Sequence, residues 1–308
     1  MQDVADAQGA NGEFTDIAPN LLRIAEKDPG APGWGDAGIL VPHATWLQYG
    51  DRSLLEKNWP AMQAWMNFIA RANPNFLREK SLGANYADWL APDPRTPRDL
   101  IATAYWMLIA QQMQTMASAL GHDDHARKYA TLIDNIRKAY QKKYVHEDGS
   151  VEGDTQSSYV LTLSAGLAPK ALEANMTERL VRNIAEHQNH LTTGFLGTPY
   201  LLSTLDKEGR LDVAYSLLLT ETYPSWGYMV GKGATTWWER WNGDTGDASM
   251  NSYNHYAFGS VMAWVTGGLQ GLMPIRHRQG STTFLSHRMS MRTYRMCMRS
   301  MTRFTERL

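Results

Sequence analysis

Apolar residues recur at three- and four-residue spacing along much of the chain, which is the period of an amphipathic helix. The clearest stripe lies within 51–73 and consists of Leu54, Leu55, Trp59, Met62, Trp65, Met66 and Ile69. A second stripe runs over 99–120, with Pro97 suited to its first turn and Gly121 to its end. A third covers about 123–143. The ranges 171–190, 210–220 and 250–265 are predicted to be further helices.

Loops rich in Gly, Pro, Asn and Asp separate these helices, and strand signals are sparse. The predicted loops cover 28–37, 91–98, 147–154, 194–199, 223–236 and 242–249. Long helices joined alternately by short turns and long polar loops are typical of antiparallel helical hairpins. The sequence therefore predicts an all-α fold with its chemistry mounted on the longer loops.

Composition narrows the class of protein. A chain of 308 residues can form one large domain or two ordinary ones. Its 30 basic and 31 acidic residues give no reason to expect an overall nucleic-acid-binding surface. Cys297 is the single cysteine, which excludes an internal disulfide framework and a multi-cysteine metal site. No run of about 18 apolar residues predicts a membrane span. No signal peptide begins at Met1, and the compartment stays open.

The stretch Gly233–Gly243 sets one carboxylate, Glu239, among three tryptophans. Sugar rings offer apolar faces that stack on indole and hydroxyls that a carboxylate binds. A partly desolvated carboxylate also holds protons more tightly, which suits general acid or base catalysis. The alternative is a surface glutamate paired with Arg240 beside core tryptophans, and spacing alone does not separate the two.

Other polar residues have both a functional and a purely structural interpretation. Asp36 follows a glycine-rich turn just before a predicted helix, where capping alone would explain it. Asp88 and Trp89 repeat the pairing of an acid with a tryptophan, and His255 could point a donor into a cleft. The His122–His125 segment resembles a metal cluster, but its acids stand where a helix start favours them, so no metal site is expected there.

Several motifs taken together resemble one family. They are, in order, Pro32–Gly38, Asp88–Leu90, Thr193–Tyr200, Tyr223–Tyr228, Gly233–Trp241 and Met250–Tyr256. This series looks like the catalytic domain of bacterial α-L-rhamnosidases, glycoside hydrolase family 78. The resemblance implies an all-α (α/α)6 barrel of six helical hairpins that removes terminal α-L-rhamnose with inversion and uses no cofactor. The implied substrate is a small-molecule or oligosaccharide rhamnoside.

The resemblance also implies roles for particular residues. By similarity Glu239 corresponds to the general base. The residues that would bind the substrate are Trp34, Asp36, Asp88, Trp89, Trp238 and His255. Trp34 and Trp89 would meet the methyl group and ring faces of the sugar. No metal ligand is implied.

The chain also departs from the family pattern. The general acid lies upstream in the family, in a segment that has no counterpart here, so an incomplete barrel without its first helices and flanking β domains is expected. The partial barrel would occupy 1–268. Residues 269–308 form an atypical tail, predicted to be disordered or non-native, because 276–308 contain eight Arg, no Lys and one acid. Losing a general acid typically costs about 10²–10⁴-fold in rate, so impaired hydrolysis is expected.

Other functions stay open on the residues alone. One alternative is a different helical-barrel glycosidase, or a lyase acting on acidic sugars. Another is a non-catalytic carbohydrate-binding remnant that holds rhamnose through Trp34, Trp89 and Glu239. A third is an interaction protein that uses the basic tail. No nucleic acid or membrane partner is expected, and the oligomeric state is open.

Overall fold

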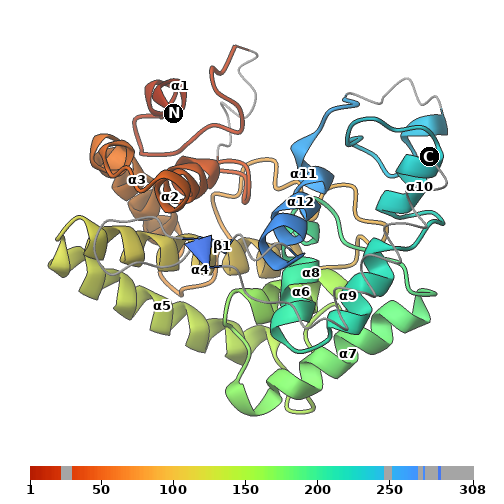
Figure 1. Ribbon diagram of the computed structural model, residues 1–308. Coiled ribbons are helices and arrows are strands. Elements are labelled where there is room, and N and C mark those ends of the chain that lie inside the picture. The colour runs from red at the N-terminus through yellow and green to blue at the C-terminus, as the bar shows by residue number, and fades with distance from the viewer. Residues whose placement is uncertain (22–29, 246–251, 270–272, 275–283, 286–308) are drawn as a thin grey trace.

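Helices arranged in pairs make up the body of the computed structural model of the chain (Figure 1), which describes residues 1–21, 30–245, 252–269, 273–274 and 284–285. The α-helices are α1 Gln2–Asp6, α2 Ala37–Tyr49, α3 Ser53–Ala72, α4 Arg98–Ala119, α5 Asp123–Tyr144, α6 Gln156–Ser164, α7 Glu173–Glu186, α8 Thr198–Lys207, α9 Leu211–Leu218, α10 Trp226–Gly231, α11 Tyr256–Gly259 and α12 Val261–Trp264. Short turns of other helix types are η1 Lys170–Leu172, η2 Gly243–Thr245 and η3 Val265–Leu269.

The helices form two rows. Helices α2, α4, α6 and α8 each pack against the next member of this series, and α8 also packs against α11 and α12. We call α2, α4, α6, α8, α11 and α12 the inner helices. Each of the first four pairs with the helix that follows it in the chain, giving the hairpins α2–α3, α4–α5, α6–α7 and α8–α9. The predicted all-α architecture of helical hairpins is confirmed.

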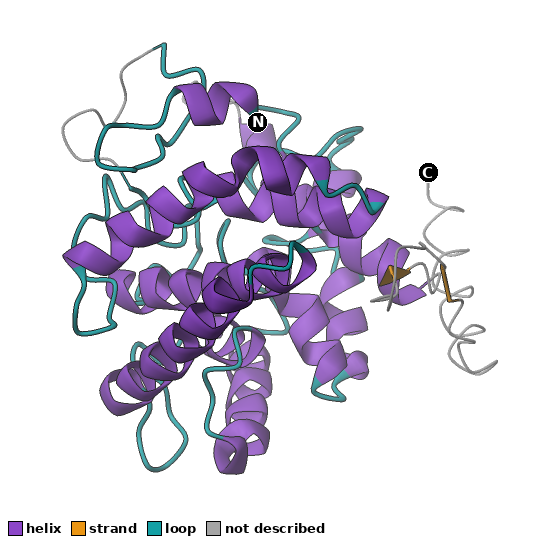
Figure 2. Ribbon diagram, turned by 90° about the vertical axis from the view of Figure 1, so that its left-hand side faces the viewer, coloured by secondary structure: helices purple, strands orange, loops and turns teal. Residues whose placement is uncertain are grey.

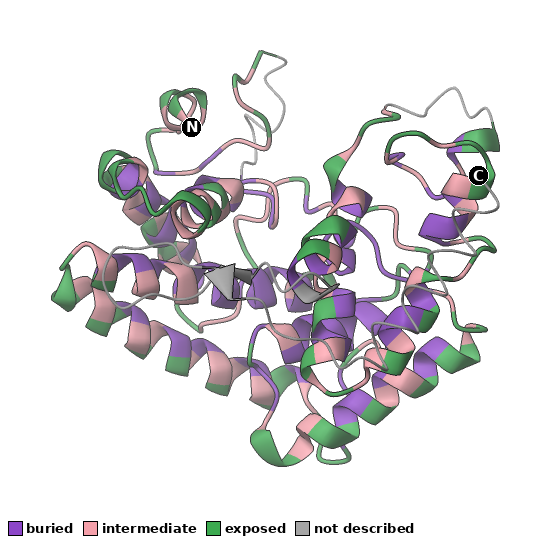
Figure 3. Ribbon diagram, viewed as in Figure 1, coloured by how far each residue is buried: buried purple, intermediate pink, exposed green. Residues whose placement is uncertain are grey.

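Burial follows this arrangement (Figure 3). Helix α4 is buried without interruption from Leu100 to Ala110, because α2, α5 and α6 all pack against it. Its sequence had predicted a single apolar stripe. Helix α5 does have a stripe, since its buried residues are Tyr129, Ile133, Ile136, Tyr140 and Tyr144. Helix α4 is therefore covered on all sides, whereas its outer partner α5 covers the core with one face.

Inner helices α4, α6 and α8 end in the same way, with a left-handed glycine at Gly121, Gly166 and Gly209. After each glycine the next backbone N–H bonds back into the helix, as from His122 to the carbonyl of Ala117 at 2.8 Å. Only glycine adopts this conformation without strain from a Cβ atom. The predicted end of α4 at Gly121 is confirmed.

The starts of the inner helices carry the candidate site residues. Asp36 immediately precedes α2, Gly197 precedes α8 and His255 precedes α11. The segment 85–93 leads toward the start of α4. These helix starts bring distant loops to one end of the helical array, opposite the glycine turns.

Some elements differ from the sequence prediction. Helices α6, α8 and α10 were not predicted, and α10 lies within the predicted loop 223–236. In α6 the buried face includes Ser157, Ser158 and Thr162, so its apolar period is hidden by polar residues that bond inside the protein. The helix predicted over 250–265 begins at Tyr256 in the described part, and Met250 and Asn251 lie outside the described residues.

Of the predicted tail, the structure describes only Leu269 and two short strands, β1 Met273–Pro274 and β2 Phe284–Leu285. These strands pair antiparallel, at the edge of the molecule in Figure 2. The other residues between 270 and 308 lie outside the described residues. No described helix combines the length and the apolar character that crossing a bilayer requires.

Candidate active site

Glu239 lies in a loop that is held against the segment leading into α11. The N–H of Glu239 donates to the carbonyl of Ser252 at 3.0 Å, and the N–H of His255 donates to the carbonyl of Trp237 at 2.7 Å. The side chain of Glu239 is only 9% exposed. This burial does not fit the alternative of an ordinary surface glutamate.

His255 is the polar neighbour of Glu239 across these two hydrogen bonds. Burial lowers the pKa of its imidazole, and the negative charge of Glu239 opposes part of that effect. Its Nδ1 accepts from the N–H of Ala257 at 3.2 Å. A neutral His255 therefore carries its proton on Nε2 and can donate a hydrogen bond from that atom.

Two rings flank the imidazole of His255. Phe195 lies 4.7 Å away between ring centroids, and Tyr256 stacks at 5.3 Å with an interplanar angle of 17°. Tyr256 is 80% exposed. The imidazole is thus held between a buried ring and a ring that faces solvent.

Two of the tryptophans near Glu239 are buried and pack against other aromatic rings. Trp241 is buried and stacks on Phe258 with centroids 3.9 Å apart, so it belongs to the core. Trp238 is also buried and meets the edge of Tyr253. These contacts fix the position of the loop on both sides of Glu239.

Asp88 connects two loops that are far apart in the sequence. Its carboxylate accepts from the N–H groups of Gly194 and Leu196 at 2.7 Å each, from Gly197 at 3.0 Å, and from the hydroxyl of Ser157. Burial raises the pKa of Asp88, although these four donors favour its charged form. Both carboxylate oxygens are therefore occupied by donors from the protein.

Trp89, next in the chain, is the exposed member of an aromatic row. Its ring meets Tyr86 at 6.0 Å, and Tyr86 meets Trp34 at 4.6 Å. The hydroxyl of Tyr86 donates to Asp16 at 2.8 Å, and burial together with this bond raises the pKa of Tyr86 to about 12. Trp89 is 39% exposed, so the row ends in a ring face open to solvent.

The loop that carries this row has an unusual backbone. Asn85, Ala87 and Leu90 all have positive φ, at 38°, 59° and 58°. Such conformations are costly for residues with a side chain and persist only where the surroundings impose them, often at functional sites. Here the Asp88 hydrogen bonds and the bond from the N–H of Phe195 to the carbonyl of Trp89, 2.9 Å, impose the loop shape.

Asp36 is fully buried beneath the turn that carries Trp34. It accepts from Arg78 at 3.0 Å, from the indole N–H of Trp65 at 3.0 Å and from the N–H of Gly33 at 2.8 Å. Arg78 is itself fully buried. The interpretation of Asp36 as a helix cap is wrong in its hydrogen bonding: the residue occupies the cap position of α2, but its side chain makes no cap bond because these donors take up the carboxylate.

Tyr105 lies near the buried carboxylates of Asp36 and Asp88. Tyr105 donates from its hydroxyl to the carbonyl of Leu196 at 3.0 Å. Burial raises its pKa well above the ordinary value, with contributions from nearby Tyr200, Asp88, Tyr256 and Asp36. Tyr105 therefore lies within electrostatic range of both ends of the candidate site.

Sequence reasoning assigned no site role to several residues that the structure places here: Arg78, Tyr86, Tyr105, Phe195, Tyr200 and Tyr256. A signal existed for most of them, because Phe195, Tyr200 and Tyr256 belong to the quoted motifs and Tyr86 stands two positions before Asp88. Arg78 carried no local signal.

His122 and His125 lie elsewhere, and their rings pack against Trp59 at 5.1 and 5.9 Å. Within the described ranges, no group of three or more His, Cys, Asp or Glu side chains could hold a metal ion.

Hydrogen bonds and ring contacts connect the segments of the candidate site. The loop of Glu239 is joined to the segment of His255 by two backbone hydrogen bonds, and the ring of His255 contacts Phe195. The backbone of Phe195 bonds to Trp89, and the aromatic row continues to Trp34. Asp36, Asp88 and Trp238 lie buried behind these contacts. Loops that precede four different inner helices thus contribute to one site.

Comparison with known proteins gives consistent results. The family described as the bacterial alpha-L-rhamnosidase 6 hairpin glycosidase domain matches residues 1–268. The chain is 46% identical to an alpha-L-rhamnosidase of Streptomyces avermitilis over 281 residues, which are 90% of this chain and 26% of that protein. A relative from Formosa agariphila is 34% identical and is covered to 31% of its length.

Solved structures agree with the sequence matches. The structure of the Streptomyces avermitilis alpha-L-rhamnosidase complexed with L-rhamnose superposes with a TM-score of 0.81 at 44% identity, over 92% of this chain and 29% of that one. Native alpha-L-rhamnosidase from Aspergillus terreus gives a TM-score of 0.82 at 30% identity, over 89% and 33%. The chain therefore spans about a quarter to a third of the length of these relatives.

Proposed function

Because the chain belongs to the bacterial α-L-rhamnosidase six-hairpin glycosidase family, we propose that its site binds terminal α-L-rhamnose and takes part in inverting hydrolysis of small-molecule or oligosaccharide rhamnosides. The observation that carries this proposal is the series of hydrogen bonds and ring contacts that links the loop of Glu239, through His255, Phe195 and Trp89, to Trp34. It joins the buried carboxylate of Glu239, the imidazole N–H of His255 and aromatic faces that reach solvent. Groups of these kinds can bind the hydroxyls and the apolar surface of a deoxy sugar.

Each group in this series has a role in the proposal. Glu239 is the general base that takes a proton from the attacking water. His255 donates from Nε2 to a sugar hydroxyl, as its Nδ1 is already occupied by Ala257. Trp34 and Trp89 provide apolar surface for the methyl group and ring face of rhamnose.

The buried residues have a supporting role. Asp36 accepts hydrogen bonds from a guanidinium, an indole N–H and a backbone N–H, and it holds the turn that carries Trp34. Asp88 holds the loop that carries Trp89. Trp238 precedes Glu239, is buried and packs against Tyr253, so it fixes the backbone beside Glu239. We therefore propose that all three shape the rhamnose pocket through their neighbours.

Inverting hydrolysis also requires a proton donor on the other side of the glycosidic bond, with the two carboxyl groups about 6.5–9.5 Å apart. Asp36 and Asp88 accept hydrogen bonds at both oxygens and lie inside the protein, so neither is placed to protonate a leaving group. The described residues thus supply the base and the sugar pocket. Hydrolysis of substrates with poor leaving groups is expected to be about 10²–10⁴-fold slower than with a paired acid.

A substrate with a good leaving group can test the general base without a paired acid. α-L-Rhamnosyl fluoride needs little protonation of its leaving group, so a site with a base alone should hydrolyse it. We expect the chain to release fluoride and to give the β-anomer first, as inversion requires. Glu239→Gln should reduce this rate by about 10²–10⁴-fold while L-rhamnose still binds in a calorimetric titration.

Glu56→Gln makes the same chemical change on the exposed surface of α3 and serves as the matched control. An unchanged fluoride rate in Glu239→Gln would show that Glu239 is not the base. Binding of L-rhamnose without release of fluoride would favour a carbohydrate-binding role without turnover. A chain that neither binds L-rhamnose nor releases fluoride would contradict the proposed function as a whole.

A further inference from the structure

A cavity opens beside the candidate active site. It has a volume of about 390 Å³, which falls in the usual range of about 300–1,000 Å³ for ligand pockets. Its lining includes Asp93, Glu186, His187, His190, Thr192 and Tyr223. None of these residues is needed for the roles proposed above. We call this cavity the side pocket.

The side pocket is built from the same two loops as the rhamnose site. The N–H of Asp93 donates to the carbonyl of Thr192 at 3.3 Å, just as the N–H of Phe195 donates to the carbonyl of Trp89. Asp93 stands four positions after Trp89, so their Cα atoms lie at most about 14 Å apart. This separation is compatible with one glycoside that engages both places.

The end of α7 supplies the other wall. The N–H of Asn189 donates to the carbonyl of Ile184, and that of Gln188 to Ala185, so the helix closes in the pattern that normally ends in glycine. Here Gln188 and Asn189 take the left-handed conformation, with φ of 56° and 58°. This turn directs the chain from His187 to His190 along the side pocket.

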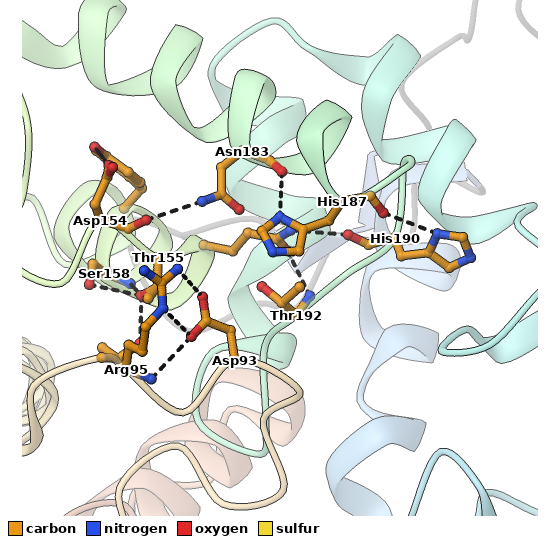
Figure 4. A network of polar contacts seen from close by, with 12 residues as sticks. Asp93, Arg95, Asp154, Thr155, Ser158, Asn183, His187, His190 and Thr192 are labelled. Atoms are coloured by element: carbon orange, nitrogen blue, oxygen red, sulfur yellow. Dashed lines mark hydrogen bonds and ion pairs between the residues drawn. The ribbon is translucent and has the colours of Figure 1, made fainter.

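The polar groups of the side pocket are held in place (Figure 4). His187 Nδ1 bonds to the carbonyl of Asn183 at 2.8 Å, and His190 Nε2 bonds to the hydroxyl of Thr222 at 2.7 Å. Arg95 donates two hydrogen bonds to Asp93, at 2.9 and 2.7 Å. The side chains are therefore ordered before any ligand arrives, which reduces the entropy lost on binding.

The hydroxyl of Thr192, which has no partner among the described residues, is the observation that indicates a ligand. The residue is 6% exposed and lines the side pocket, yet its buried hydroxyl has no hydrogen-bond partner among the described residues. A buried hydroxyl without a partner costs stability, so a ligand hydroxyl that reaches it after a small rotation of the side chain would be favoured. Tyr223 adds a ring that is 50% exposed and is fixed by the edge of Tyr228 at 5.5 Å.

These features fit the chemistry of a sugar. The carboxylates, the Nε2 atom of His187 and a hydroxyl can meet sugar hydroxyls, and one aromatic face can meet the apolar side of a pyranose ring. We propose that the side pocket binds the pyranose unit to which the terminal rhamnose is attached. This inference rests on the proposed function, because it places the leaving group of that reaction.

Calorimetric titration of the whole chain tests this inference with three probes: L-rhamnose, D-glucose and the disaccharide α-L-rhamnosyl-(1→6)-D-glucose. Wild type should bind the disaccharide more tightly than L-rhamnose. Tyr223→Ala should weaken disaccharide binding by about tenfold and leave the affinity for L-rhamnose unchanged within about twofold. Tyr223→Phe keeps the ring and should bind the disaccharide nearly as wild type does.

Proton NMR of the histidine rings provides a second measurement, made on the wild-type chain. The disaccharide should shift the resonances of His187, His190 and His255, whereas L-rhamnose should shift His255 alone. Assignment requires only single His→Gln variants of the nine histidines.

The outcomes separate the two proposals. If His255 responds to both sugars while His187, His190 and the Tyr223 variants show no effect of the disaccharide, the side pocket is wrong and the proposed function stands. If the disaccharide shifts only His187 and His190, the rhamnose site is wrong, and the leaving-group assignment falls with it. If neither probe binds, both proposals are overturned.

Discussion

Gly194 and Asp88 stand 106 positions apart in the sequence and are joined by a 2.7 Å hydrogen bond from the N–H of Gly194 to the carboxylate of Asp88. The backbones are so close at this point that a Cβ on Gly194 would lie 2.4 Å from the carbonyl oxygen of Trp89 and 2.5 Å from that of Asp88. The close contact exists because glycine has no side chain to prevent it.

Gly194→Ala should therefore move the loop that carries Trp89. The atoms that a methyl group would meet belong to the backbone and cannot rotate away, so we expect a loss of about 1–3 kcal/mol in the free energy of unfolding. Urea unfolding measures this loss, and a titration with L-rhamnose should show weaker binding. Gly231→Ala, where a Cβ meets nothing within 4 Å, should change stability by less than about 0.5 kcal/mol. Equal effects of the two changes would contradict the proposed close contact.

Asp88→Asn should destabilise the protein with little change of shape. The new amide nitrogen would face N–H donors that now meet a carboxylate oxygen, and leaving buried donors unpaired costs about 1–3 kcal/mol. The same change at Asp134, which is 65% exposed, should have almost no effect. Chemical unfolding of both variants is the measurement. A stability of Asp88→Asn equal to that of wild type would remove Asp88 from its supporting role.

Arg78→Met should be the most destabilising of these substitutions. It leaves the Asp36 carboxylate buried without its charge partner, and breaking a buried ion pair typically costs about 3–5 kcal/mol. Removing both charges, as Arg78→Met with Asp36→Asn, should recover part of the loss. Arg127→Ala breaks a pair in which both side chains are exposed and should cost less than about 1 kcal/mol.

Sugar binding distinguishes a role of Arg78 in positioning Trp34 from a role in stability alone. At a urea concentration and temperature where the Arg78 variant stays folded, its affinity for L-rhamnose should still fall, because the turn from Gly33 to Asp36 holds Trp34. A folded variant with normal affinity would limit Arg78 to a purely stabilising role.

His255 should titrate below its ordinary pKa of 6.5, because burial favours the neutral ring. NMR titration of wild type checks this value. Glu239→Gln should lower the pKa of His255 further, since the carboxylate now favours the imidazolium. An unchanged pKa in that variant would contradict the proximity of the two side chains.

The pH dependence of stability follows from the same shift. Between the lowered pKa and 6.5 the unfolded chain binds a proton at His255 that the folded chain does not. The contribution of the neutral ring to stability is therefore complete above pH 6.5 and is lost as the pH falls through the pKa of the folded state. A His255→Gln variant should lose less stability than wild type over that window.

The long helices could be predicted from the sequence because their signals are local. In α3 and α5 one apolar face repeats over five or more turns, and the predicted bounds lie within two residues of the observed ones. Helices α6 and α8 escaped prediction for the opposite reason. They are short, and they bury Ser, Thr and Gln side chains whose hydrogen-bond partners come from other loops.

The candidate site was only partly accessible from the sequence. Glu239 and His255 were found because they stand among aromatic residues in the quoted motifs. The link that Asp88 makes between loops could not be found, because its partners lie 69 to 109 positions further along the chain. Arg78 resembles any surface arginine until the fold buries it against Asp36.

The glycine turns after α4 and α8 have a practical consequence. Gly121 and Gly209 are exposed, no atom lies within 4 Å of a Cβ placed on either, and both stand at the opposite ends of their helices from the candidate site. Exposed turns of this kind accept inserted segments well. A tether for attachment to a solid support, or a fluorescent reporter, inserted after either glycine should leave the loops of the candidate site undisturbed.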